Sequence, residues 1–275
     1  MINDFFQIMT LPFLACLILT GIHAYLGFHV IERQVIFVDL ALAQIAALGS
    51  SVSILLGYGL DGAASYWLSL SFAIAGAAIF SLTRFKKQRI PQEAIIGIAY
   101  AVSAAMLIIV LSRSGEGDEH IKQAMVGNIL LVQMPEIIKI FLIYTAIGIA
   151  HFIFRKNFLM ISNDAAQAYE QGVNVRLWDF IFYVTFGFVV TSSVRIAGVL
   201  LVFSFLVVPA VCAILFSENL KTRLLLGWGF GFLASAAGIV ASYYLDLPTG
   251  ASVVCVFGGM LVLLACFKKI FIART

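Results

Sequence analysis

Long uninterrupted apolar runs dominate the pattern of this 275-residue chain. Runs that contain no charged residue extend over 62–83, 94–112, 196–216, 224–245 and 247–267. A helix needs about 20 mostly apolar residues to cross the hydrocarbon core of a bilayer. The pattern therefore predicts several transmembrane helices rather than the core of a water-soluble domain.

Nine candidate spans follow from this pattern, at 7–29, 36–57, 63–83, 94–112, 137–154, 178–194, 196–216, 224–245 and 248–267. Two are weaker than the rest, because Lys139 lies in the fifth span and Asp179 in the sixth. The apolar segment Gln123–Met134 is too short to cross and predicts a re-entrant or interfacial piece. The predicted fold is all-α: one polytopic transmembrane helix bundle of about eight or nine spans, forming a single domain over residues 1–275.

Composition and charge support this assignment and orient it. The chain is 62% hydrophobic and only 11% charged, whereas soluble domains carry about 25% charged residues. Cytoplasmic loops of membrane proteins carry an excess of Lys and Arg. With the N-terminus outside and the C-terminus in the cytoplasm, all but four of the 17 Lys and Arg residues are cytoplasmic; the four are Arg113, Lys122, Lys139 and Arg195. No basic block is long enough to indicate a nucleic-acid partner.

Small residues recur at helix-face spacing in two spans. They are Gly227, Gly231 and Ser235 in one, and Ala73, Ala77 and Ser81 in the other. Such stripes allow close approach of helix backbones in lipid. They predict a compact bundle and are compatible with a dimer.

The longest predicted cytoplasmic connection, from Arg155 to Arg176, contains a short helix signal. Asn163 or Asp164 can cap its free amides, and Gly172 can take the left-handed position that ends it. A helix this short is not stable alone in water. A linker turn is one interpretation; we favour a docking helix, held by the bundle or by a partner protein.

Motifs for chemistry are absent from the sequence. It contains no Walker A loop, no HExxH and no GxSxG, the patterns of P-loop ATPases, zinc peptidases and serine hydrolases. The histidines are few and none forms a chelating pair at helix-face spacing. We therefore expect neither an enzyme nor a bound cofactor.

Asp39 is the one acid well inside a predicted span. Ionisable residues there are costly and usually mark a pathway or a partner. In one interpretation Asp39 stays near the interface, where it pairs with Arg33 or caps the helix. In the other it faces the inner mouth of an ion path as an oxygen ligand, with His23 as the second polar group. Gln44 would not share its face, because five residues turn a helix about 140° past a full turn.

Seven sequence blocks resemble the membrane permease subunits of ABC importers for zinc, manganese or iron. They are GFHVIER (27–33), FVDLALAQIAALG (37–49), EAIIGIAY (93–100), HIKQAMVGNIL (120–130), DAAQAYEQGVNVRLWD (164–179), TSSVRIAGVLLVFSFLVVPAVCA (191–213) and SYYLDLPTGA (242–251). The last two together carry most of the resemblance.

The resemblance implies a homodimeric permease in a bacterial inner membrane, with a second copy of the chain completing its core. Two separate ABC ATPase subunits would drive import of a divalent transition metal, or its chelate, by alternating access. An extracytoplasmic metal-binding protein would deliver the cargo. The segment at about 157–176 would couple to the ATPase through Asp164, Ala165, Ala166, Ala168, Gly172 and Val173.

The second span departs from the family pattern, which usually has an Asp and a His four residues later. Alignment on Gly49 puts Gln44 in the His position and Leu40 in the Asp position, whereas alignment on Asp39 puts Ala43 in the His position. An amide is a poorer transition-metal ligand than imidazole, so the identity of the metal stays open.

Two other classes of function are a stand-alone secondary transporter, which usually shows internal repeats, and a membrane scaffold.

Overall fold

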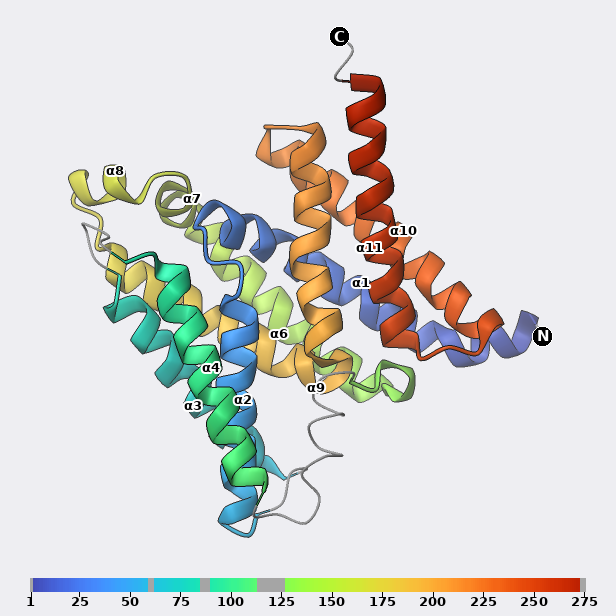
Figure 1. The fold of residues 1–275 in the computed structure, drawn as a ribbon, viewed down its shortest axis with the longest axis horizontal. Helices are drawn as coiled ribbons and strands as arrows, with labels where there is room; N and C mark the ends of the chain where they lie inside the picture. The colour runs from blue at the N-terminus through green and yellow to red at the C-terminus, as the bar shows by residue number, and fades with distance from the viewer. Residues whose placement is uncertain (1, 59–61, 85–89, 113–126, 273–275) are drawn as a thin grey trace. The chain divides into compact units, whose positions relative to one another are not determined.

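The structure, a computed structural model, describes residues 2–58, 62–84, 90–112 and 127–272. This part of the chain is helical and contains no strand. Eight helices are long and apolar enough to cross a membrane (Figure 1). They are α1 (Ile2–Glu32), α2 (Val38–Leu55), α3 (Ala63–Leu82), α4 (Gln92–Leu111), α6 (Met134–Ile153), α9 (Val175–Phe216), α10 (Leu220–Leu245) and α11 (Thr249–Phe267).

Four shorter elements complete the described chain: the 3₁₀ turn η1 (Ile129–Leu131), α7 (Arg155–Asn163), α8 (Ala165–Glu170) and the π-helical turn η2 (Lys268–Ile272). The prediction of an all-α polytopic bundle is confirmed. The inside–outside orientation stays a prediction. Several residues used for it or for the resemblance lie outside the described residues: Lys86, Lys87, Arg89, Arg113, residues 120–126 and Arg274.

The predicted sixth and seventh spans are two parts of α9. This helix has 42 residues and would extend about 63 Å if straight, at ~1.5 Å per residue, roughly twice the hydrocarbon thickness of a bilayer. Gly198 interrupts it with φ 74° and ψ 162°, a conformation that glycine adopts without steric cost. The break divides α9 into two stretches, each as long as a single crossing.

The described residues form two compact units. The first contains 1–28, 125–145 and 195–275, and the second contains 29–124 and 146–194. The helices α1, α6 and α9 each contribute residues to both units.

In the second unit, α2 packs against both α3 and α4, and the three lie side by side in Figure 1. Close approach depends on glycine: a Cβ at Gly49 would lie 2.7 Å from the Leu68 carbonyl oxygen. Polar side chains in this interface bond to backbone carbonyls. Ser69 Oγ donates to Ala46 O at 2.8 Å, and Gln92 Nε2 donates to Phe80 O at 2.8 Å.

In the first unit, the small-residue stripe of α10 packs within the chain. A Cβ at Gly231 would lie 2.4 Å from Thr20 Cγ2 of α1, and the nearest contacts of one at Gly227 would be Phe28 and Ala24. Gly238 approaches Val253 of α11 in the same way. This stripe therefore joins α10 to helices of its own chain.

The segment around η1 packs on the break in α9. The Asn128 amide donates to Ile196 O at 3.1 Å. A Cβ at Gly127, whose φ is +66°, would lie 2.2 Å from the Ala197 carbonyl carbon, so the contact requires glycine. The rest of the predicted interfacial segment, residues 123–126, lies outside the described residues.

Candidate functional site

The short helix predicted in the hydrophilic connection is α8. Asp164 is its N-cap, with Oδ1 accepting from the amides of Ala166 at 2.9 Å and Gln167 at 3.0 Å. Gly172 follows its end with φ +76°, the left-handed conformation expected of a C-terminal glycine. These two signals are confirmed, and they delimit a helix of six residues.

The chain itself holds α8 in place. Ala168 is fully buried in an apolar cluster with Ile161 of α7 and Val175 of α9. Partly buried neighbours pack against this cluster: Met160, Ala165, Tyr169, Val173 and Trp178. The helix is thus anchored on α7, which lies within the predicted hydrophilic connection, and on the first turn of α9.

The six residues predicted to couple to an ATPase divide into two sets. Ala168 is buried, and Ala165 and Val173 are half-buried against the cluster. Asp164, Ala166 and Gly172 are exposed. Gln167, Glu170 and Gln171 are also exposed, so α8 presents a polar outer face of small, amide and acidic residues.

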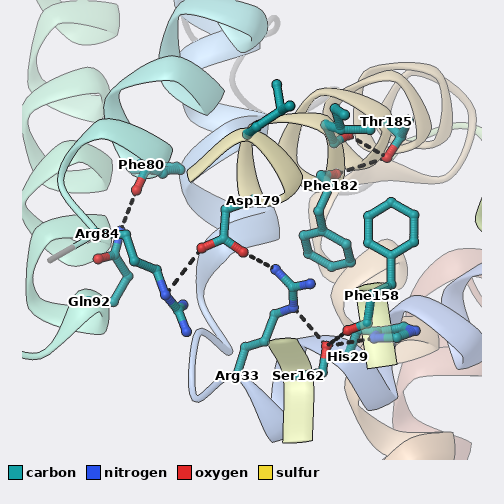
Figure 2. Close-up of polar contacts among 12 residues, drawn as sticks. His29, Arg33, Phe80, Arg84, Gln92, Phe158, Ser162, Asp179, Phe182 and Thr185 are labelled. Carbon is teal, nitrogen blue, oxygen red and sulfur yellow. Dashed lines mark hydrogen bonds and ion pairs between the residues drawn. The ribbon is translucent and has the colours of Figure 1, made fainter. Parts of the chain in front are cut away.

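A buried ion network lies beside this segment (Figure 2). Arg33, which directly follows α1, donates from NH1 to Asp179 Oδ1 of α9 at 2.5 Å, and both side chains are fully buried. The other Asp179 oxygen, Oδ2, forms an ion pair at 3.1 Å with Nε of Arg84, just after α3. One carboxylate therefore joins the ends of two helices to a third.

Burial affects the electrostatics of Arg33. It lowers the pKa of the guanidinium, and the adjacent Asp179 carboxylate opposes that effect. Arginine stays protonated in proteins, so the network holds charged groups out of water. The guanidinium carbon also lies 4.1 Å from the centre of the Phe182 ring, a favourable cation–π contact.

Ser162 of α7 extends the network. Its Oγ accepts from Arg33 Nε at 2.8 Å, donates to Phe158 O and contacts His29 Nδ1 at 2.8 Å. Because the hydroxyl proton goes to Phe158, His29 Nδ1 donates in this contact. The neighbouring His151 stacks on the Phe158 ring with centroids 4.2 Å apart and bonds through Nε2 to Thr185 Oγ1 at 2.9 Å.

The predicted pathway residues fall in both units. Asp39, in the first turn of α2, is 2% exposed. The predicted pairing with Arg33 was wrong, because Arg33 bonds to Asp179 instead. Asp39 lies in the first turn of α2, and its helix-terminal role stays a prediction. On the neighbouring α4, Glu93 Oε1 accepts from the Phe37 amide at 2.9 Å and so holds the start of α2.

Gln44 and His23 differ in their surroundings. Within the described part of the chain, Gln44 Oε1 and Asp39 Oδ1 are buried and accept no hydrogen bond. His23 is fully buried in α1, in the first unit, and its Nδ1 bonds to Leu19 O at 2.8 Å. Among the described residues, no group of three or more His, Cys, Asp or Glu is arranged to hold a metal.

The ion network was not predicted from the sequence. Arg33 and Arg84 were counted among the cytoplasmic charges, Arg33 was also offered as a partner of Asp39, and Asp179 marked a weak span, whereas all three are buried. A useful signal was present: an acid inside a span needs a partner, and basic residues lay at the ends of two other predicted helices.

The described residues thus form a polytopic bundle of apolar helices with a short polar helix, α8, anchored in the connection between two of them. This chain belongs to the ABC 3 transport family, whose model matches residues 5–268. It is 29% identical to a Listeria innocua protein, "Manganese transport system membrane protein MntC", over 70% of this chain and 71% of that one. It is 28% identical to "Manganese import system permease protein ScaB" of Streptococcus gordonii, over 70% of each.

Among solved structures, the fold is similar to that of "PsaBC from Streptococcus pneumoniae in complex with Fab". The TM-score is 0.80 at 22% identity, and the match covers 100% of both chains. The family resemblance predicted from the sequence is confirmed. The chain is a metal ABC transporter permease, a multi-pass protein of the bacterial inner membrane.

Proposed function

We propose that this permease imports a divalent transition metal (zinc, manganese or iron), or its chelate, in an ATP-driven cycle of alternating access. A second copy completes the core, two separate ABC ATPase subunits supply the energy, and an extracytoplasmic metal-binding protein delivers the cargo. The main support for this proposal is α8, a capped helix that packs against its own chain and leaves a polar face exposed. Such a face fits a protein partner outside the membrane.

The division of the predicted coupling residues supports this role. Ala165, Ala168 and Val173 hold the segment on α7 and α9, so Asp164, Ala166 and Gly172 would meet the ATPase. Energy coupling requires α8 to be held firmly, because a loosely attached helix would move with the ATPase without moving the membrane helices.

The cargo contacts we propose are on α2. Asp39 offers a carboxylate and Gln44 an amide oxygen, and both have buried oxygens that accept no hydrogen bond in the described part of the chain. Because the two side chains, five positions apart, do not share a helix face, they would contact the cargo at separate points of the path. His23 of α1, the third predicted pathway residue, belongs to the other unit. Oxygen ligands suit manganese better than the softer metals, and the relatives named above carry manganese in their names.

The test is purification of the tagged chain from its native membrane, followed by reconstitution in liposomes. ATP-dependent uptake of ⁵⁴Mn, ⁶⁵Zn and ⁵⁵Fe is measured with the co-purifying subunits and binding protein. We expect an ATPase to co-purify and uptake to stop without ATP. Uptake by the chain alone, driven by an ion gradient, would instead identify a secondary transporter. If no metal is taken up and no ATPase co-purifies, the result would favour a membrane scaffold.

A further inference from the structure

We propose that Arg33 is a positioning residue for energy coupling. With Asp179 and Arg84, it ties the α7–α8 segment to the ends of α1 and α3 and to α9, so that displacement of α8 reaches these helices. This inference rests on the proposed function, because it assumes that α8 meets an ATPase. It adds the route by which movement at α8 enters the membrane helices.

Three contacts fix the Arg33 side chain between elements. Nε donates to Ser162 Oγ of α7 at 2.8 Å, NH1 donates to Asp179 Oδ1 of α9 at 2.5 Å, and the guanidinium plane lies over Phe182. The planar guanidinium carries donors in a rigid fork, which a lysine ammonium cannot reproduce. Figure 2 shows Arg33 between Ser162 and Asp179.

Ser162 connects this clamp to α8. It lies two positions before the cap residue Asp164, and α7 and α8 share the apolar cluster around Ala168. The Ser162 hydroxyl is held from three sides, by Arg33, His29 and its own helix at Phe158. A shift of α8 would therefore move the Ser162 hydroxyl, which is hydrogen-bonded to His29 and Arg33 at the end of α1.

Arg84 carries the connection to α3. Its Nε lies 3.1 Å from Asp179 Oδ2, while Arg33 occupies the other oxygen. The Asp179 carboxylate, near the start of α9, thus contacts two cations that follow different helices. The network joins four elements through one carboxylate and one hydroxyl.

Stability alone is a weak reason for such a network. Replacing a buried ion pair by packed apolar residues is often neutral or stabilising, because the charges no longer have to be desolvated. Directional hydrogen bonds, in contrast, hold helix ends in one register. We therefore expect a variant with apolar residues in place of Arg33, Arg84 and Asp179 to fold, but to transmit the movement of α8 to the membrane helices poorly.

The experiment uses the assembled transporter in liposomes and measures metal imported per ATP hydrolysed. Two variants are compared with the wild type: the triple variant Arg33→Met, Arg84→Met, Asp179→Leu, and the single variant Ser162→Ala, which keeps all the charges. Arg33→Lys is the conservative replacement. Lys221→Met, an exposed basic residue at the start of α10, is the control.

We expect the triple variant and Ser162→Ala to assemble with the ATPase and hydrolyse ATP, while import per ATP falls about two- to thirty-fold. Arg33→Lys should lie between them and the wild type, and Lys221→Met should match the wild type. An unchanged ratio in Ser162→Ala overturns the inference, even if the triple variant fails to assemble. If the wild type shows no ATP-driven import, the proposed function fails, and this inference fails with it.

Discussion

Arg33 and Asp179, separated by 146 positions in the sequence, meet at 2.5 Å with both side chains fully buried. The contact connects the end of α1 to the second turn of α9 in a region that also holds the anchored helix α8. It places a buried ion pair between two membrane helices beside α8.

Asp179→Asn should strongly destabilise the permease. It removes the one carboxylate between Arg33 and Arg84 and leaves two buried cations, and breaking a buried pair in this way costs about 3–5 kcal/mol. Thermal unfolding of the purified protein in detergent measures the effect. Asp164→Asn, which changes an exposed carboxylate and keeps a capping oxygen, should unfold close to the wild-type midpoint. Equal midpoints for both variants would contradict the network.

Ala166→Arg and Ala168→Arg should fail in different ways. Ala166 is exposed, so the arginine should leave the fold intact and obstruct the ATPase, reducing ATP-driven uptake about tenfold or more, an effect of roughly 1.4 kcal/mol. Ala168 is fully buried, and a charge there should lower the amount of folded protein in membranes. Uptake and membrane protein level are measured for both. Wild-type uptake in Ala166→Arg would count against docking through α8.

Cysteines placed at Gln171 and Gln133 test the orientation. Both positions are exposed in the chain, and the positive-inside rule puts Gln171 in the cytoplasm and Gln133 outside. In a variant without the four native cysteines, an impermeant thiol reagent added to intact cells should label position 133 and spare position 171. Permeabilised cells should label both. The reverse pattern would invert the predicted topology.

Asp39→Asn tests the metal pathway. The change keeps the size of the side chain while removing the charge that a divalent ion prefers. We expect uptake of the metal to be lost with normal assembly and ATPase binding. Uptake and membrane protein level are measured together. A loss explained wholly by lower protein level would assign Asp39 a structural role at the start of α2.

Local features of the chain were predictable because they depend on residues within a few positions of one another. Hydropathy located the spans, since the bilayer sets a required length. Asp164 and Gly172 delimited α8 because caps act on the nearest amides and carbonyls. The break at Gly198 was not predictable in this way, because a glycine can also lie in a straight helix. Its positive φ occurs where the Gly127–Asn128 segment packs on α9.

The pairing of distant residues was decided by the tertiary structure. The sequence by itself determined that the chain is a bundle of membrane helices of a metal ABC permease type, with one short capped helix between spans. It offered Asp39, only six positions away, as one possible partner of Arg33. The fold gives Arg33 to Asp179 and turns Ala168 inward, because a buried charge or methyl group takes its partner from whichever element packs against it.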